Sequence, residues 1–257
     1  MTVSLLYSLC SSSCGAVCLA CSENESLTDI TSVKIETIVV TPFQQNARLV
    51  YDEVSLIGSV IDPGGDVQRI YARIQQLELQ IESIVLTHSH IDHAGGVQRL
   101  RRLLSELGGA TNLTIPLYAH IAEESFRDSI REQARHYGLP PSDFEDCPEP
   151  EMNLEDGEFI EIAGEAVELL YTPGHSPGHV SLYFASSSLG PLLIAGDTIF
   201  RESIGRTDLP FGDSQQLVRS IQDKILTLPG ETKILSGHGP DSTVAHEREF
   251  NPYVSQK

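Results

Sequence analysis

Cysteine is almost absent from the main part of this chain of 257 residues. Four of the five cysteines lie within the first 21 residues, at Cys10, Cys14, Cys18 and Cys21, and only Cys147 follows them. Disulfide bonds therefore do not hold the main body together, which favours a reducing, cytoplasmic compartment. The early cysteines have a spacing that can hold an iron–sulfur cluster, but no strand or glycine-rich context surrounds them, so we do not expect one.

Basic residues are also scarce. The chain has 17 lysines and arginines against 36 aspartates and glutamates, which gives a formal net charge of −19. Such a surface repels phosphate backbones and anionic lipids, so neither nucleic acid nor a membrane is the expected partner.

The first 22 residues contain no charged side chain, so the positive start of a secretory signal is missing. Residues 4–20 are apolar but interrupted by serines, and they are too short and polar for a good membrane span. We expect residues 1–30 to be a disordered or weakly ordered N-terminal extension and residues 31–257 to form the folded domain.

Hydrophobic periodicity within residues 31–257 alternates between the strand and helix patterns. Strands are predicted at 33–41, 46–51, 55–61, 81–87, 114–118, 159–162, 166–172, 179–184, 191–195 and 233–235. Helices are predicted at about 67–77, 97–107, 121–137 and 214–226, and a proline- and acid-rich loop at 140–151. The β-rich start and the later alternation predict an α/β fold with two mixed sheets covered by helices, a four-layer αββα sandwich or a relative of it.

The most specific motif is a cluster of metal-binding side chains that begins where an apolar strand ends. His88, His90, Asp92 and His93 lie within six residues, just before a predicted helix. Imidazole nitrogens and carboxylate oxygens suit zinc, iron or manganese, and loops at strand ends display such side chains over a rigid sheet.

Three more potential ligands follow later apolar runs, each beside or near a glycine. His175, Asp197 and His238 stand at the ends of the predicted strands 166–172, 191–195 and 233–235. Each residue alone would more often be structural, but together with the first cluster they predict one metal centre.

Other polar residues near these motifs receive different interpretations. We expect His179 to support the site or to pack. His120, His136 and His246 are read as surface or structural histidines, and Ser89 and Ser176 as spacers, because no nucleophile elbow surrounds the two serines.

These motifs resemble the metallo-β-lactamase superfamily over nearly all of residues 33–253, and within it the short glyoxalase II-like hydrolases. The resemblance implies that two divalent ions, zinc first and iron or manganese as alternatives, are bound by seven side chains. One ion would be held by His88, His90 and His175, the other by Asp92, His93 and His238, and Asp197 would bridge them. It also implies that Asp62 supports a ligand histidine, and that Asp92 is catalytic and orients a metal-bound hydroxide.

The predicted activity is hydrolysis of a small-molecule thioester, with S-lactoylglutathione as the example. Asp197 argues against a true β-lactamase, and the stretch 200–208 resembles the short glyoxalase II-like branch. Only 19 residues follow His238, whereas full-length hydroxyacylglutathione hydrolases have a further helical domain, so recognition of glutathione stays open. Arg206 either recognises a substrate carboxylate or pairs with Asp208.

Three alternatives remain beside this prediction. The first is a persulfide dioxygenase of the same fold, which uses a single iron held by two histidines and an aspartate. The second is a non-catalytic metal-binding scaffold, which the complete ligand set disfavours. The third is a nuclease of the same superfamily, which the negative charge and the lack of a basic stripe disfavour. The oligomeric state cannot be predicted from these patterns.

Overall fold

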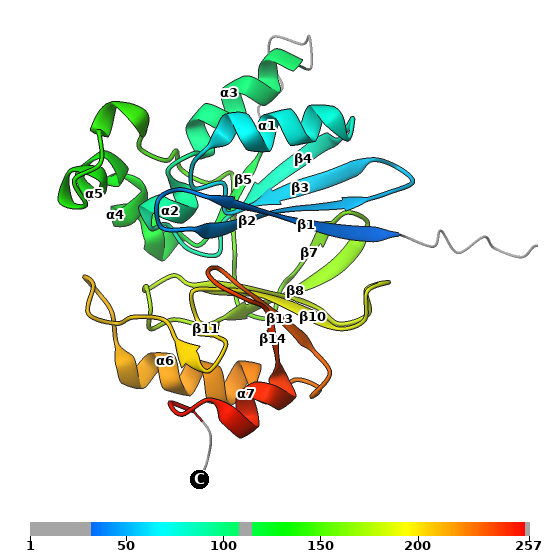
Figure 1. Ribbon diagram of the computed structural model, residues 1–257, viewed down its shortest axis with the longest axis vertical. Coiled ribbons are helices and arrows are strands. Elements are labelled where there is room, and N and C mark those ends of the chain that lie inside the picture. Colours follow the sequence, from blue (N-terminus) through cyan, green and yellow to red (C-terminus); the bar gives the residue numbers. More distant parts are fainter. Residues whose placement is uncertain (1–31, 108–114, 255–257) are drawn as a thin grey trace, which may run out of the picture. The chain divides into compact units, whose positions relative to one another are not determined.

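The computed structural model describes residues 32–107 and 115–254, all of which belong to one compact unit. Two six-stranded sheets lie face to face, and helices cover the outer face of each sheet (Figure 1). The predicted four-layer αββα architecture is therefore confirmed. The predicted extension, residues 1–30, lies outside the described residues.

The first sheet begins with an antiparallel meander and continues with parallel strands. Its strands follow chain order: β1 (Val33–Val40), β2 (Gln45–Asp52), β3 (Ile57–Ile61), β4 (Gln80–Val85), β5 (Leu117–Ala119) and β6 (Met152–Asn153). Parallel neighbours need a long crossover. The crossovers here contain α1 (Val67–Gln76) between β3 and β4, and α3 (Val97–Leu107) between β4 and β5.

The second sheet has the order β14-β13-β10-β9-β8-β7 and is antiparallel except between β10 and β13. Its strands are β7 (Phe159–Ile162), β8 (Glu165–Tyr171), β9 (Val180–Phe184), β10 (Leu192–Gly196), β13 (Lys233–Ser236) and β14 (Ser242–Thr243). The outer layer consists of α6 (Ser214–Ser220), the π-helical turn η3 (Ile221–Ile225) and α7 (Val244–Phe250). A small hairpin, β11 (Ile199–Phe200) and β12 (Ser203–Ile204), follows β10.

Three hydrophobic clusters fill the three spaces between the four layers. Ile70 and Leu100 of the helices pack with β2 and β4 in the first cluster. The second cluster lies between the sheets, and the third joins the second sheet to α6 and η3. Strand β10 is apolar on both of its faces: Ile194 belongs to the cluster between the sheets, and Leu193 belongs to the outer cluster. A strand buried on both faces reads as a continuous apolar run.

One predicted helix is wrong in detail. Residues 121–137 form three short pieces, η1 (Ile121–Glu123), α4 (Glu124–Arg127) and α5 (Ile130–His136). At the break, the hydroxyl of Ser129 donates to the carbonyl oxygens of Ser125 and Phe126, and such side-chain bonds compete with a continuous helix. The predicted loop 140–151 contains only the short helix η2 (Pro141–Asp143).

Among the described residues, no helix combines the length and the apolar character needed to cross a lipid bilayer.

Candidate metal centre

Loops at one edge of the two sheets bring the seven predicted ligands together. His88 and His90 lie in the loop after β4, and Asp92 and His93 lie on the short helix α2 (Ile91–Ala94) that follows it. The second sheet supplies the other three: His175 follows β8, Asp197 follows β10, and His238 follows β13. Because β10 and β13 are parallel neighbours, Asp197 and His238 emerge from adjacent strand ends.

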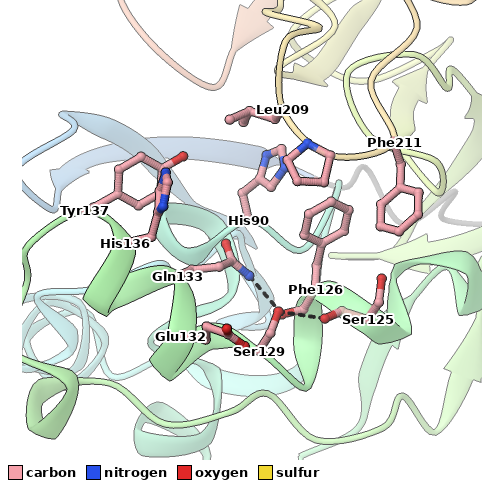
Figure 2. Close-up of a pocket in the computed structure, with 11 residues that line it drawn as sticks. His90, Ser125, Phe126, Ser129, Glu132, Gln133, His136, Tyr137, Leu209 and Phe211 are labelled. Atoms are coloured by element: carbon pink, nitrogen blue, oxygen red, sulfur yellow. Dashed lines mark hydrogen bonds between the residues drawn. The ribbon is translucent and has the colours of Figure 1, made fainter.

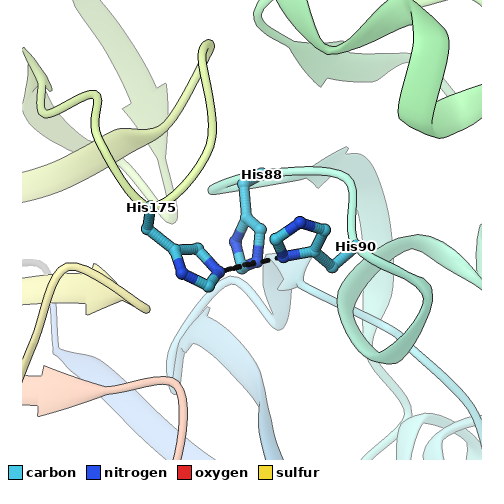
Figure 3. A group of neighbouring side chains, drawn as sticks. All are labelled: His88, His90 and His175. Atoms are coloured by element: carbon cyan, nitrogen blue, oxygen red, sulfur yellow. Dashed lines mark hydrogen bonds between the residues drawn. The ribbon is translucent and has the colours of Figure 1, made fainter. Parts of the chain in front are cut away.

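The first group of potential ligands consists of three buried histidines (Figure 3). Nε2 of His175 lies 3.2 Å from Nε2 of His88 and 2.9 Å from Nδ1 of His90. Three ring nitrogens from two loops therefore point at one position.

Asp92, His93 and His238 form the second group. Nε2 of His238 lies 3.2 Å from Oδ2 of Asp92. Asp197 reaches both groups: its Oδ2 lies 3.6 Å from Nε2 of His175 and 3.5 Å from Nε2 of His238, and its Oδ1 lies 3.3 Å from Nε2 of His93. Asp197 thus stands between the groups, where a bridging ligand would have to be.

Hydrogen bonds to the outer nitrogens determine which ring nitrogen faces the centre. Nδ1 of His175 donates to the carbonyl oxygen of Arg206 over 2.8 Å, and Nδ1 of His238 donates to that of Phe43 over 3.0 Å. A carbonyl oxygen can only accept, so in both rings Nδ1 carries a proton and Nε2 is the nitrogen that faces the centre and can bind a metal.

Asp62 and Thr87 orient two more histidines in the same way. Both oxygens of Asp62 accept from Thr87, one from its amide and one from its hydroxyl, each over 2.7 Å. Oδ2 of Asp62 also accepts from Nδ1 of His93 over 3.0 Å. Since the single hydroxyl proton of Thr87 goes to Asp62, its oxygen accepts from Nδ1 of His88 over 3.1 Å. The Nε2 atoms of His88 and His93 are therefore free to bind a metal.

The two groups differ in their electrostatics. Burial, reinforced by neighbouring imidazoles, lowers the pKa of His88 well below its usual range and that of His90 to about 3. Burial also acts to lower the pKa of His93 and His238, but nearby carboxylates outweigh it. They raise the pKa of His93 well above its usual value and that of His238 to about 9. A cation that binds there displaces protons.

The donor set fits a metal. Nε2 of His93 and Oδ1 of Asp197 are buried 3.3 Å apart, and neither has a hydrogen-bond partner. With one ring proton on Nδ1, lone pairs of both atoms face each other, so a second proton or a metal cation is needed between them, and the raised pKa of His93 reflects that need. Nitrogen and carboxylate donors of this kind suit zinc and comparable divalent ions.

His179 lies next to the proposed ligand Asp197 and bonds to its backbone. It is fully buried, and its Nε2 accepts from the amide of Asp197 over 3.0 Å. The other predicted non-ligands lie elsewhere: His120 stacks on Tyr171, and His246 pairs with Glu202. His136 is exposed, on α5.

Arg206 forms an ion pair with Asp208. The guanidinium makes two bonds to the carboxylate, of 2.7 and 2.8 Å, and both side chains are more than half exposed. Arg206 also lines a cavity of about 390 Å³ over the centre. The remaining lining residues lie in loops, on α2 and in the β11–β12 hairpin: Phe43, His90, Asp92, Tyr137, His175, Asp197, Phe200, Ser203, Ile204, Leu209 and His238.

Sequence reasoning missed Glu123. This fully buried glutamate accepts from the amide of Ser89 over 2.8 Å and from the amide of Gly178 over 2.7 Å. It therefore joins the loop that carries His88 and His90 to the loop that carries His175. Burial raises its pKa, although the bonds to the two amides oppose that shift.

Comparison with known proteins assigns the family. The profile of the metallo-β-lactamase superfamily matches residues 40–238. The chain belongs to that superfamily. The hydroxyacylglutathione hydrolase GloC of Haemophilus influenzae is 34% identical over 226 residues, which cover 88% of this chain and 100% of that protein. The probable metallo-hydrolase YqgX of Bacillus subtilis is 36% identical over 230 residues, or 87% and 98% of the two chains.

Solved structures of the superfamily agree with the fold. The B3 metallo-β-lactamase BLEG-1 superposes with a TM-score of 0.75 at 32% identity, covering 87% of this chain and 100% of its own. TTHA1623 in a di-iron-bound form gives a TM-score of 0.71 at 33% identity, covering 85% and 99%. The protein is therefore a metallo-hydrolase of this superfamily, with histidine and aspartate clusters able to bind metal.

Proposed function

We propose that this metallo-hydrolase cleaves thioesters at a centre of two divalent ions, with zinc favoured over iron or manganese. His88, His90 and His175 would hold one ion, Asp92, His93 and His238 the other, and Asp197 both. The observation that carries this proposal is the position of Asp197, whose two oxygens lie within 3.6 Å of nitrogens from both groups. A single ion bound at one group would leave the lone pairs of the other group without a metal.

When bound, such ions lower the pKa of a water molecule towards neutrality and polarise the carbonyl of the substrate. The chain supplies the orientation. Asp92 lies on the cavity side of the centre, where it can orient the attacking water and hold its proton. His88 and His93 are almost completely buried, which keeps bulk solvent away from the other side.

A thioester suits this arrangement because its leaving group needs no help. A thiol has a pKa near 8.5, so its thiolate departs without prior protonation, whereas an amine must be protonated as it leaves. In this proposal Asp197 is held between the two ions, which leaves Asp92 as the carboxylate at the cavity wall that can carry a proton. The likeness to GloC leads us to propose an S-2-hydroxyacylglutathione, such as S-lactoylglutathione, as substrate; water then yields the hydroxy acid and the thiol.

The likeness to BLEG-1 makes a β-lactam the second candidate, because a β-lactam is an amide and its carbonyl would lie at the same centre. A persulfide dioxygenase with a single iron is a weaker candidate, since it would leave His93 and His238 without an evident role.

One experiment separates these functions. Protein purified without a histidine tag would be analysed for metal content and assayed with S-lactoylglutathione, other thioesters, a β-lactam and a persulfide, with and without oxygen. We expect two ions per chain and thioester cleavage without oxygen. Full activity with one ion or none would refute the two-metal centre. Oxygen-dependent turnover of the persulfide, or cleavage of the β-lactam alone, would refute the thioester assignment.

A further inference from the structure

A second cavity lies beside the cavity over the metal centre. It has a volume of about 290 Å³ and is lined by residues of α4 and α5 and by the turn 209–212 (Figure 2). His90, Tyr137 and Leu209 line both cavities. Because His90 is a proposed ligand, a group held in the second cavity would be next to the reacting carbonyl.

One wall of this cavity is a series of aromatic rings (Figure 2). The ring of Phe126 meets that of His90 edge to face, with centroids 4.8 Å apart. The ring of Phe211 in turn meets that of Phe126 edge to face, with centroids 5.9 Å apart. The rings thus lead from the metal centre to the outside, a surface suited to an apolar or aromatic group.

Two polar side chains of the wall, those of Ser129 and Gln133, are bonded to the backbone. Ser129 donates its hydroxyl to the carbonyl oxygens of Ser125 and Phe126. Gln133 accepts from the amide of Ile91 and donates to the carbonyl oxygen of Phe126, each over 2.9 Å. The bond to Ile91 also attaches α5 to the residue after His90. The wall is therefore held in position relative to the metal centre.

Phe211 occupies an unfavourable position at the mouth of the cavity. Its φ is 64°, in a turn closed by a 3.0 Å bond from the amide of Gly212 to the carbonyl oxygen of Leu209, where turns favour glycine. Its side chain is also 67% exposed. Strained backbone concentrates at ligand-binding sites. An apolar ligand that covers the ring would offset the cost of its exposure.

The charges of the cavity decide which part of a thioester fits. Glu132 is its charged lining residue besides the titratable His136, and no lysine or arginine lines it. A thiol such as glutathione carries carboxylates, which a cavity without cations does not bind. The acyl group is the apolar part. A cavity of about 150 Å³ already accepts benzene, so one of 290 Å³ has room for a phenyl ring and more.

We propose that the second cavity binds the apolar side chain of the acyl group, and that the enzyme prefers aromatic 2-hydroxyacyl thioesters to lactoyl thioesters. This inference rests on the proposed thioester hydrolysis and adds the substrate class.

The kinetic test compares S-mandeloylglutathione with S-lactoylglutathione. For Phe211→Ala we expect kcat/KM to fall about tenfold with the mandeloyl substrate and less than twofold with the lactoyl substrate. Phe211→Gly should behave alike and keep the fold, because glycine suits the positive φ. Phe159→Ala is the matched control, since Phe159 is 64% exposed on β7, outside the residues that line either cavity, and should change neither value. Equal effects of Phe211→Ala on both substrates, or no effect, would overturn the proposal.

A binding measurement separates this inference from the proposed function. Calorimetry on the metal-loaded protein should show mandelate binding about tenfold more tightly than lactate, and Phe211→Ala should abolish that difference. If no thioester is cleaved but this preference is found, thioester hydrolysis is wrong and the apolar subsite stands. If thioesters are cleaved but mandelate has no advantage, the subsite is wrong and the hydrolase stands.

Discussion

Replacing Asp62 by asparagine tests how the metal centre is held in position. Asp62 accepts three hydrogen bonds, two from Thr87 and one from Nδ1 of His93. Asparagine keeps the volume and tolerates the φ of 51° at this position, but it replaces one acceptor oxygen by an NH₂ group. In place of Oδ1, this NH₂ group faces the amide of Thr87, so two donors meet. In place of Oδ2, it faces Nδ1 of His93, which must then move its proton to Nε2. In both cases His93 becomes a poorer ligand.

The size of the effect follows from these contacts. Losing one charge-assisted bond and leaving a buried donor unpaired costs about 1.5–3 kcal/mol of the free energy of unfolding. For a protein of this length, that lowers Tm by about 3–6 °C. Loss of a partner that orients a ligand weakens metal affinity by roughly 10–100-fold. We expect the weaker affinity at only one of the two metal-binding steps. Asp62 bonds to His93 of the second group and to no histidine of the first group.

The assay is a titration of the metal-free protein with zinc in competition with a chromophoric chelator, together with thermal unfolding. Asp66→Asn is the matched control: Asp66 lies in the same loop with a φ of 47°, but it is exposed and bonds to Thr41 instead of the centre. It should bind zinc like the wild type. If Asp62→Asn also binds both ions with unchanged affinity, Asp62 does not determine the tautomer of His93 and this reasoning fails.

Three further predictions concern other parts of the chain. Asp92→Asn should lower kcat with thioesters by roughly a hundredfold or more, and a variant within a few-fold of wild type would contradict its role. Glu123→Ala should lower the free energy of unfolding by about 2–4 kcal/mol in urea titrations, because two buried amides lose their acceptor, whereas the exposed Glu124→Ala should change it little. Deletion of residues 1–28 should leave folding and hydrolysis intact; loss of folding or of metal would show that Cys10–Cys21 are structural.

The fold could be predicted because local patterns report it. The strands of both sheets are apolar runs, and the ligand motifs stand where those runs end. Phe159–Ile162 is found as predicted, and most other ends shift by one or two residues. The pieces that were missed, such as β11, β12 and β14, have only two residues each, too few for any period to show.

The parts that could not be predicted depend on backbone groups far away in the sequence. Glu123 reads as one more acidic residue of a helix, yet its partners are the amides of Ser89 and Gly178, 34 and 55 residues away. Every residue carries an amide, so no residue type in the sequence marks these two. The break at Ser129 is similar, because a serine inside a helical pattern gives no sign of which carbonyl it will bond.

The arrangement of the ligands explains why their atoms lie at metal-binding distances of one another. The ligands come from both sheets, and hydrogen bonds between backbone atoms join the loops that carry them. The amide of Val180 donates to the carbonyl oxygen of Thr87, that of Asn46 to Gly237, and that of Gly237 to Gly196. Glu123 adds a side-chain link of the same kind. Hydrogen bonds of the protein itself thus hold the loops around the centre, and a metal would replace the proton that His93 and Asp197 otherwise need between Nε2 and Oδ1. A site held in this way spends little of the metal-binding free energy on ordering its ligands.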